Sequence, residues 1–536
     1  MINISISKKE WRWVSLWALL IMIITSLPYL YGFLLSTPEQ QFSGFVLGVE
    51  DGNSYLAKMR LGADRGWLFY LPYTPEPHQG AYIYIFYLLL GKINAGLPVS
   101  APFIYHLARF IFGLGLLYAI YYFIVHFDKN IPRRRFAFLL VAFGSGLGWL
   151  LISLGLTSRF GLPLDVYVPE GFIFLLLLNL PHLALAESLL FLALLLTWRS
   201  WMNDAWGPAV GAGVALLIMS LMASFYLAVF AATLGGFWLV LFINKQPGLW
   251  PVLPKISLPL FIAAPVPLYQ IYVFISNPVF RVWGQQNIIL SPPIWHYLLA
   301  YGLLILPAIY GGRHWLTNVQ TPAARRNALF LIVWCVIFPA LVYLPFNLQR
   351  RLVVGVQVPL AILATRGLFR FYEQRLATSR QTIAQIGTLF FFSLTNLLIL
   401  TGAFLTLSGR GQPVFQPTTT IEAMQWLADQ TEGDIVLATY DTGNLLPVYA
   451  NVRTFVGHGP ETVNSEVKRA QALRFFSNGV DDAWRRDLLT EFNIAYVYYG
   501  PAEQVTGDFA PDQAPYLEKI YDNKGVQIFK VKRDEG

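Results

Sequence analysis

The sequence predicts a polytopic α-helical membrane protein, and three observations support this fold class. The chain has 536 residues, of which 56% are hydrophobic and only 13% are charged, whereas soluble domains carry roughly 25% charged residues. The mean hydropathy is +0.51. Apolar runs near 20 residues recur along the chain, and each is long enough to cross about 30 Å of hydrocarbon.

These apolar runs predict about eleven membrane spans. The run 208–243 is too long for one helix, and we divide it at residues 223–225. The N-terminal MINISISKKEWRW is basic and leads into an apolar stretch without a small-residue cleavage site, so we expect a retained first helix. The predicted spans are 12–34, 102–126, 136–156, 172–197, 208–222, 226–243, 252–275, 294–312, 328–345, 352–367 and 383–406.

The distribution of Lys and Arg predicts the orientation of the spans. With the N-terminus in the cytoplasm, most basic residues fall in cytoplasmic loops, as the positive-inside rule requires. An odd number of spans then places the C-terminal region outside. The apolar segment 81–97 is expected to lie in the interface or to be re-entrant, because a further span would reverse everything downstream. We therefore expect the C-terminal region to be extracytoplasmic.

The composition changes near residue 410 and predicts two domains. Residues 1–409 would form the membrane domain, with outer loops at 35–101 and 157–171. Residues 410–536 alternate short strand and helix patterns, such as the buried strand DIVLATY and the helix VKRAQALRFF, which predicts a small α/β domain.

Charge and cysteine content exclude several functional classes. The net charge of +8 comes from Lys and Arg dispersed among loops, which suits membrane lipid headgroups and does not indicate nucleic acid. The one cysteine, Cys335, excludes an intramolecular disulfide and a cysteine-based metal site.

The stretch VEDGNSYLAKMR opens the first outer loop with an adjacent acidic pair, Glu50 and Asp51. One interpretation is an ordinary solvated loop in which Asp51 caps a helix that starts near Gly52. Helical spacing would place Tyr55 and Lys58 on the face of Asp51. The functional alternative is that these carboxylates carry chemistry.

Other polar residues fall in the same predicted compartment. Asp165 and Glu170 lie in the second outer loop, where they are either solvated acids or functional groups. The Arg350-Arg351 pair departs from the positive-inside trend at an outer helix end, and it either extends to lipid headgroups or binds phosphate. Three histidines are further candidates: His78, His182 and His458. His182 follows a proline and is either functional or a packed, hydrogen-bonded histidine. His458 lies in the segment GHGPETVNSE, in which Thr462 would cap the following helix.

Taken together, the first helix, the outer loop that opens on an acidic pair followed by a tyrosine, the juxtamembrane apolar segment, the many spans and the extracytoplasmic C-terminal domain resemble the GT-C glycosyltransferases. This family includes protein O-mannosyltransferases, oligosaccharyltransferase catalytic subunits and lipid A aminoarabinose transferases. The likeness covers most of the chain in layout, although the motif itself is short.

The resemblance implies an inverting hexosyl or pentosyl transfer from a polyprenyl-phosphate donor to a glycan, lipid or protein acceptor of the cell envelope. It implies Asp51 as catalytic base, with Glu50 in reserve, and Arg350 and Arg351 as donor-phosphate contacts. The acceptor or secondary residues would be Asp165, Glu170, Tyr55, His78, His182 and His458. No cofactor is certain; a divalent metal, Mg²⁺ or Mn²⁺, would use Asp51, Asp165 or Glu170.

Two alternatives stay open. A transporter or flippase of lipid-linked sugars would also need arginines near phosphate, but it should show an inverted repeat, and none is visible. A non-catalytic GT-C relative that acts in envelope assembly would keep the same layout.

Overall fold

The computed structural model describes residues 6–319 and 321–532 and divides into two compact units. The first unit comprises the chain up to Leu27, His106–Tyr269 and Ile289–Gly402. The second comprises Pro28–Tyr105, Gln270–Ile288 and the chain from Ala403 onward. The C-terminal region therefore shares its compact unit with two earlier segments, which the change of composition near residue 410 did not indicate.

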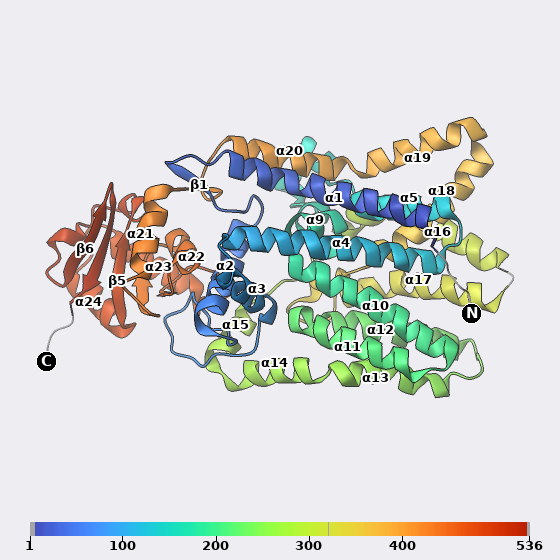
Figure 1. The fold of residues 1–536 in the computed structure, drawn as a ribbon, viewed down its shortest axis with the longest axis horizontal. Helices are drawn as coiled ribbons and strands as arrows, with labels where there is room; N and C mark the ends of the chain where they lie inside the picture. Colours follow the sequence, from blue (N-terminus) through green and yellow to red (C-terminus); the bar gives the residue numbers. More distant parts are fainter. Residues whose placement is uncertain (1–5, 320, 533–536) are drawn as a thin grey trace. The chain divides into compact units, whose positions relative to one another are not determined.

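The chain is an integral membrane protein built from long apolar helices (Figure 1). Among the residues that the structure describes, nine helices are long and apolar enough to cross a membrane, or up to eleven if each of two bent helix pairs is one span. This range includes the predicted eleven. The nine are α1 (Lys8–Leu34), α4 (Ala101–Phe127), Ile131–Ser153 (α5 and α6), α10 (Pro181–Asn203), α11 (Trp206–Ala223), α12 (Tyr226–Ile243), α16 (Ile294–Asn318), α17 (Pro322–Leu341) and Gln349–Arg375 (η3 and α18).

Several predicted spans are broken. The split of 208–243 is confirmed, because α11 ends at Ala223 and α12 begins at Tyr226. The single span 172–197 is wrong: α9 (Ile173–Asn179) and α10 are separated at Leu180, since the ring of Pro181 disfavours helical backbone in the residue before it. Two other spans are bent by 46° and 47°: Trp250–Ala263 with α14 (Pro265–Ser276), and α19 (Thr378–Phe392) with α20 (Leu394–Ser408).

Short elements fill the second predicted outer loop and the approach to α18 in the first unit. They are α7 (Thr157–Phe160), α8 (Leu164–Tyr167), the 3-10 helix η1 (Pro169–Gly171) and the 3-10 helix η3 (Gln349–Val353), which precedes α18 (Gln357–Arg375). The segments η1 and η3 pack together, as do α16 and α18.

The first outer loop folds within the second unit. It contains β1 (Gln40–Phe42), α2 (Val49–Arg65) and α3 (Ile85–Ala95). Helix α3 has 11 residues, about 17 Å at 1.5 Å per residue, which is too short to cross the hydrocarbon. It packs closely on α2, because a Cβ atom on Gly91 would lie 1.8 Å from the carbonyl oxygen of Met59.

The predicted C-terminal α/β structure is a five-stranded mixed sheet with helices on both faces. Its strand order is β4-β3-β5-β7-β6, with β3 parallel to β4 and β5, and β7 antiparallel to β5 and β6. One core lies under α23 and α24, and the other under α21 and α22. The strands are β3 (Ile435–Leu437), β4 (Arg453–Thr454), β5 (Ile494–Tyr499), β6 (Leu517–Asn523) and β7 (Val526–Val531), and the helices are α21 (Thr418–Ala428), α22 (Tyr440–Tyr449), α23 (Ser465–Phe476) and α24 (Asp482–Glu491).

Two contacts join the first outer loop to this sheet domain within the second unit. Strand β1 pairs in an antiparallel manner with β2 (Phe415–Pro417), and α2 packs on α22. These contacts bring the acidic pair of α2 to the C-terminal residues that follow β3 and β4.

Candidate functional site

The acidic pair lies in the first turn of α2. The helix begins at Val49, and its N-cap is Gly48, with φ of 60° and no side-chain cap. The expectation that Asp51 caps a helix near Gly52 is therefore wrong, since Asp51 already lies inside the helix. In the first turn, both carboxylates interact favourably with the positive end of the helix dipole.

Asp51 is held by a histidine from the far end of the sequence. The Nε2 atom of His458 lies 3.3 Å from Oδ1 of Asp51, and the Asp51 side chain is 66% exposed while that of His458 is 7% exposed. Burial acts against the charged imidazole, but the hydrogen bond to Asp51 and the charge of Glu461 outweigh it, so the pKa of His458 is raised. A fixed imidazole thus orients a carboxylate that stays open to solvent.

A buried ion pair lies behind His458. Nζ of Lys58 lies 2.7 Å from Oε1 of Glu461, and the two side chains are 1% and 3% exposed. Ser54 donates to the same oxygen at 3.1 Å, while the Lys58 ammonium lies 4.4 Å from the ring centroid of Tyr84. Since buried charges persist only when they are paired, this network fixes the loop that carries His458 against α2.

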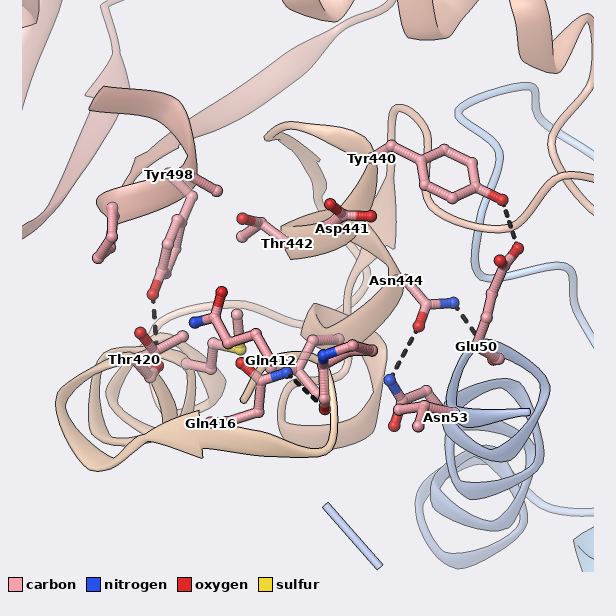
Figure 2. A pocket seen from close by; sticks show the side chains of 16 residues that line it. Glu50, Asn53, Gln412, Gln416, Thr420, Tyr440, Asp441, Thr442, Asn444 and Tyr498 are labelled. Carbon is pink, nitrogen blue, oxygen red and sulfur yellow. Dashed lines mark hydrogen bonds between the residues drawn. The ribbon is translucent and has the colours of Figure 1, made fainter. Parts of the chain in front are cut away.

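Glu50 has a different set of partners (Figure 2). The hydroxyl of Tyr440, the first residue of α22, donates to Oε1 of Glu50. The backbone nitrogen of Gly459 lies 3.4 Å from the same oxygen. Burial, together with the Glu50 hydrogen bond, raises the pKa of Tyr440. The side chain of Asn444 donates to the backbone oxygen of Glu50 at 3.3 Å. Glu50 therefore fastens α22 to α2, while Asp51 faces His458.

The loop after β4 approaches α22 closely. A Cβ atom on Gly443 would lie 1.9 Å from the carbonyl oxygen of Val456, so a larger residue would push the two segments apart. Thr462 does not cap α23, as the sequence suggested, because the N-cap is Asn464. The hydroxyl of Thr462 instead donates to the carbonyl oxygen of Tyr73 at 2.7 Å and joins this loop to the first outer loop.

A cavity of about 270 Å³ opens beside Glu50 (Figure 2). The side chains of Asn53 and Asn444 point toward one another in it, and Asn53 donates to Oδ1 of Asn444 at 2.8 Å. The residues that line it come from α2, from the chain around β2 and α21, from α22 and from the end of β5: Val49, Glu50, Asn53, Gln412, Pro413, Gln416, Thr420, Met424, Tyr440, Asp441, Thr442, Asn444, Leu445, Tyr498, Pro501 and Ala502.

Two other candidates of the first outer loop have different surroundings. Tyr55 stacks on Tyr87, with ring centroids 4.6 Å apart and an interplanar angle of 13°. His78 accepts from the backbone N–H of Leu71 at 2.9 Å, and its other ring nitrogen lies 2.8 Å from the carbonyl oxygen of Glu76. Burial lowers the pKa of His78. Both ring nitrogens of His78 are thus used in contacts with the backbone of the first outer loop.

Asp165 is fully buried in the first unit, so the expectation of a solvated loop acid is wrong. Its Oδ2 accepts from the backbone N–H groups of Gly146 and Gly148 at 2.9 and 3.1 Å, and from the Thr395 hydroxyl at 2.8 Å. These bonds join the short helix α8 to the bend between α19 and α20.

Glu170 is also buried, and it pairs with one of the two candidate arginines. Nε of Arg351 lies 3.3 Å from Oε1 of Glu170. The guanidinium of Arg350 instead lies 5.0 Å from the ring centroid of Tyr167, and its buried Nε has no hydrogen-bond partner. The two arginines therefore have different environments. Arg351 is paired with a carboxylate, whereas the Nε–H group of Arg350 has no hydrogen-bond acceptor.

Helix α10 carries two further ionisable residues of the first unit. His182 is buried in its first turn, next to Pro181. Glu187 is fully buried, and neither of its carboxylate oxygens has a hydrogen-bond partner. An acid in a membrane span with this environment marks a functional position more often than an ordinary packing position.

Sequence reasoning did not find Tyr440, Asn444 or Asn53 as parts of the site. No local pattern identifies them, since their partners lie almost 400 positions away. Glu461 and Lys58 were visible as isolated charges in two separate segments, but nothing in either segment indicates that they pair.

The described residues do not form a three-ligand metal site. Over 6–319 and 321–532, no group of three or more His, Cys, Asp or Glu side chains is placed to hold a metal ion. Asp51 belongs to the second unit, and Asp165 and Glu170 belong to the first. Oδ2 of Asp165 and Oε1 of Glu170 already bond to N–H groups, a hydroxyl and Arg351, whereas the buried Oδ1 of Asp165 has no hydrogen-bond partner. The divalent-cation site stays a prediction.

Comparison with known proteins gives no match to a protein-family model and none to a curated protein sequence. Among solved structures, the oligosaccharyltransferase of Archaeoglobus fulgidus, tethered to an acceptor peptide, aligns with 15% identity and a TM-score of 0.50 over 90% of this chain and 69% of its own. ArnT from Cupriavidus metallidurans aligns with 13% identity and a TM-score of 0.49 over 95% of this chain and 97% of its own. The first likeness, together with the membrane helices and the C-terminal sheet, shows that the chain has the GT-C fold.

Proposed function

We propose that this protein is a glycosyltransferase that moves a sugar from a polyprenyl-phosphate donor to an acceptor on the outer face of the bacterial cytoplasmic membrane. The observation that carries the proposal is Asp51, an exposed carboxylate fixed by the buried His458 in a chain with the GT-C fold. The similar structure from Archaeoglobus fulgidus is an oligosaccharyltransferase, which supports glycosyl transfer as the reaction class.

Asp51 acts as the base in this proposal. The acceptor hydroxyl oxygen attacks the anomeric carbon, and the bond between that carbon and the phosphate oxygen breaks with its electron pair left on the phosphate. The Asp51 carboxylate takes the hydroxyl proton as the new glycosidic bond forms. Glu50 is the weaker candidate, because its Oε1 already accepts from Tyr440.

Arg350 is the proposed donor-phosphate contact. A guanidinium N–H that is buried without a partner gains a charge-assisted hydrogen bond when an anionic oxygen reaches it. Arg351, engaged by Glu170, is the supporting member of the pair.

Asp51→Asn is the test of the transferase. We expect a correctly inserted protein whose transfer from a radiolabelled polyprenyl-phosphate sugar falls by about 10²–10⁴-fold, the usual contribution of a general base. Asp64→Asn, which removes another carboxylate from the same helix, is the matched control and should keep full transfer. Unchanged transfer in the Asp51 variant would exclude the base assignment.

A transporter of lipid-linked sugars is the second candidate, and Glu187 favours it. Membrane-embedded acids without partners are typical of transport pathways and proton relays. An assay of the same membrane preparation with the labelled donor lipid distinguishes the two functions. A transporter would move the labelled lipid between leaflets and form no new glycosidic bond, and a non-catalytic assembly protein would do neither.

A further inference from the structure

We propose that the cavity beside Glu50 binds a neutral saccharide and that this saccharide is the acceptor. This inference rests on the proposed transferase and names its acceptor class. The cavity lies within the second unit, and its volume of about 270 Å³ is close to the lower end of the roughly 300–1,000 Å³ that small-molecule sites occupy. It suits one or two sugar rings better than a folded protein segment.

The buried wall of the cavity is made of amides and hydroxyls. Gln416, Thr420, Thr442 and Asn444 are buried there. Amide and hydroxyl groups both donate and accept hydrogen bonds, which matches the hydroxyl groups of a sugar.

One amide in the wall has an acceptor with no protein partner. Asn53 is 3% exposed, and its Oδ1 has no hydrogen-bond partner although its Nδ2 donates to Asn444. A buried polar atom that stays unsatisfied costs free energy. Asn53 also lines the cavity, so a rotation of its side chain that turns this oxygen toward a ligand hydroxyl would remove the cost and favour a polyhydroxyl ligand.

The charges of the residues that line the cavity disfavour an anionic ligand. The described residues that line the cavity include no Lys, Arg or His, and the exposed rim carries the carboxylates of Glu50 and Asp441. A phosphate-bearing lipid headgroup would meet repulsion there. The rings of Tyr440 and Tyr498 add apolar surface, which suits the C–H faces of a sugar ring.

The position of Glu50 connects the cavity with the transferase. Glu50 lines the cavity, and Asp51 follows it in the first turn of α2 without lining the cavity itself. A saccharide in the cavity is therefore held next to the residue that precedes the proposed base. The sugar of the lipid-linked donor shares the same hydroxyl chemistry, and the experiment must separate the two.

The experiment measures saccharide binding to the full-length protein purified in detergent, with no donor present. The probes are a glycan array of neutral, acidic and phosphorylated oligosaccharides, followed by titration of the best neutral binder. We expect neutral glycans to bind the wild type. The double variant Gln412→Ala with Asp441→Asn should raise their Kd about tenfold, because hydrogen bonds at the rim of the cavity are lost. The matched double variant, Gln513→Ala with Glu432→Gln, changes similar side chains outside the cavity and should bind as the wild type does.

The outcomes are distinct from those of the transferase test. Asp51→Asn should keep saccharide binding even where transfer is lost, because Asp51 does not line the cavity. The inference is overturned if no saccharide binds the wild type, if acidic glycans bind best, or if the cavity variant leaves glycan affinity unchanged. It is also overturned if that variant weakens only the binding of a labelled polyprenyl-phosphate sugar, which would assign the cavity to the donor.

Discussion

At the scale of single residues, the two adjacent carboxylates of α2 have different environments. Glu50 accepts from Tyr440 and borders the cavity, while Asp51 faces a buried imidazole and remains exposed. The difference follows from helix geometry, since consecutive side chains point about 100° apart. The bond of Asp51 to a buried histidine also makes the stability of the second unit sensitive to pH.

His458 should stabilise the folded protein at low pH. Its pKa is raised above the ordinary value of 6.5, so protonated His458 is favoured in the folded state. Its contribution is complete below pH 6.5 and is lost as the pH rises through the raised pKa. Thermal unfolding across about pH 5 to 9 should show the wild type losing stability in that window.

The variant His458→Asn should show a flatter pH dependence in the same window, whereas His314→Asn in the first unit should follow the wild type. Parallel pH profiles for the wild type and His458→Asn would contradict the assignment.

At the scale of elements, the 3-10 helix η3 separates the functions of two arginines that the sequence treated as one pair. Arg351 is directed to Glu170 of η1, and Arg350 to Tyr167 of α8. A 3-10 helix has about three residues per turn, so neighbouring side chains diverge by about 120°. The two side chains therefore leave the backbone in different directions, and here they contact different partners.

We therefore expect different losses from the two arginines. Arg350→Ala should weaken the binding of a labelled polyprenyl phosphate about tenfold with little change in stability, because a charge-assisted hydrogen bond is lost. Arg351→Ala should lower the unfolding free energy by about 1–3 kcal/mol, because it leaves the buried Glu170 without its ion pair. Ligand titration and chemical denaturation measure the two effects, and equal affinity for wild type and Arg350→Ala would rule out the phosphate contact.

At the scale of the whole molecule, the number of spans decides the topology. If each bent helix pair crosses once, the described residues contain eleven spans, and an odd number leaves the start of α1 and the C-terminal sheet domain on opposite faces. The short helix α3 does not alter this parity, because 11 residues do not reach across the hydrocarbon.

Cysteine labelling tests this topology. In a Cys335→Ala background, Lys129→Cys lies between α4 and α5, and Val505→Cys lies in the C-terminal domain, where Val505 is 86% exposed. A membrane-impermeant maleimide should label position 505 on intact cells and position 129 only after the membrane is opened. Labelling of both positions on the same face would mean that one of the bent pairs does not cross, whereas labelling of position 129 alone from outside would mean that α3 crosses or that the orientation is inverted.

The sequence by itself determined the membrane class, the approximate spans, the break between α11 and α12 and the α/β character of the C-terminal region. These properties depend on hydropathy and periodicity, which are local. The sequence did not predict the helix break at Pro181 or the two helix bends, because the apolar pattern continues across each of them.

Only the tertiary structure decided which residues meet. Asp51 and His458 lie 407 positions apart, and Lys58 and Glu461 lie 403 apart. Packing of α2 on α22 selects these partners, and buried charges then require them to pair. The same packing forms the cavity beside Glu50. Neither feature can be found in any single segment, because the free energy that specifies it arises only between segments.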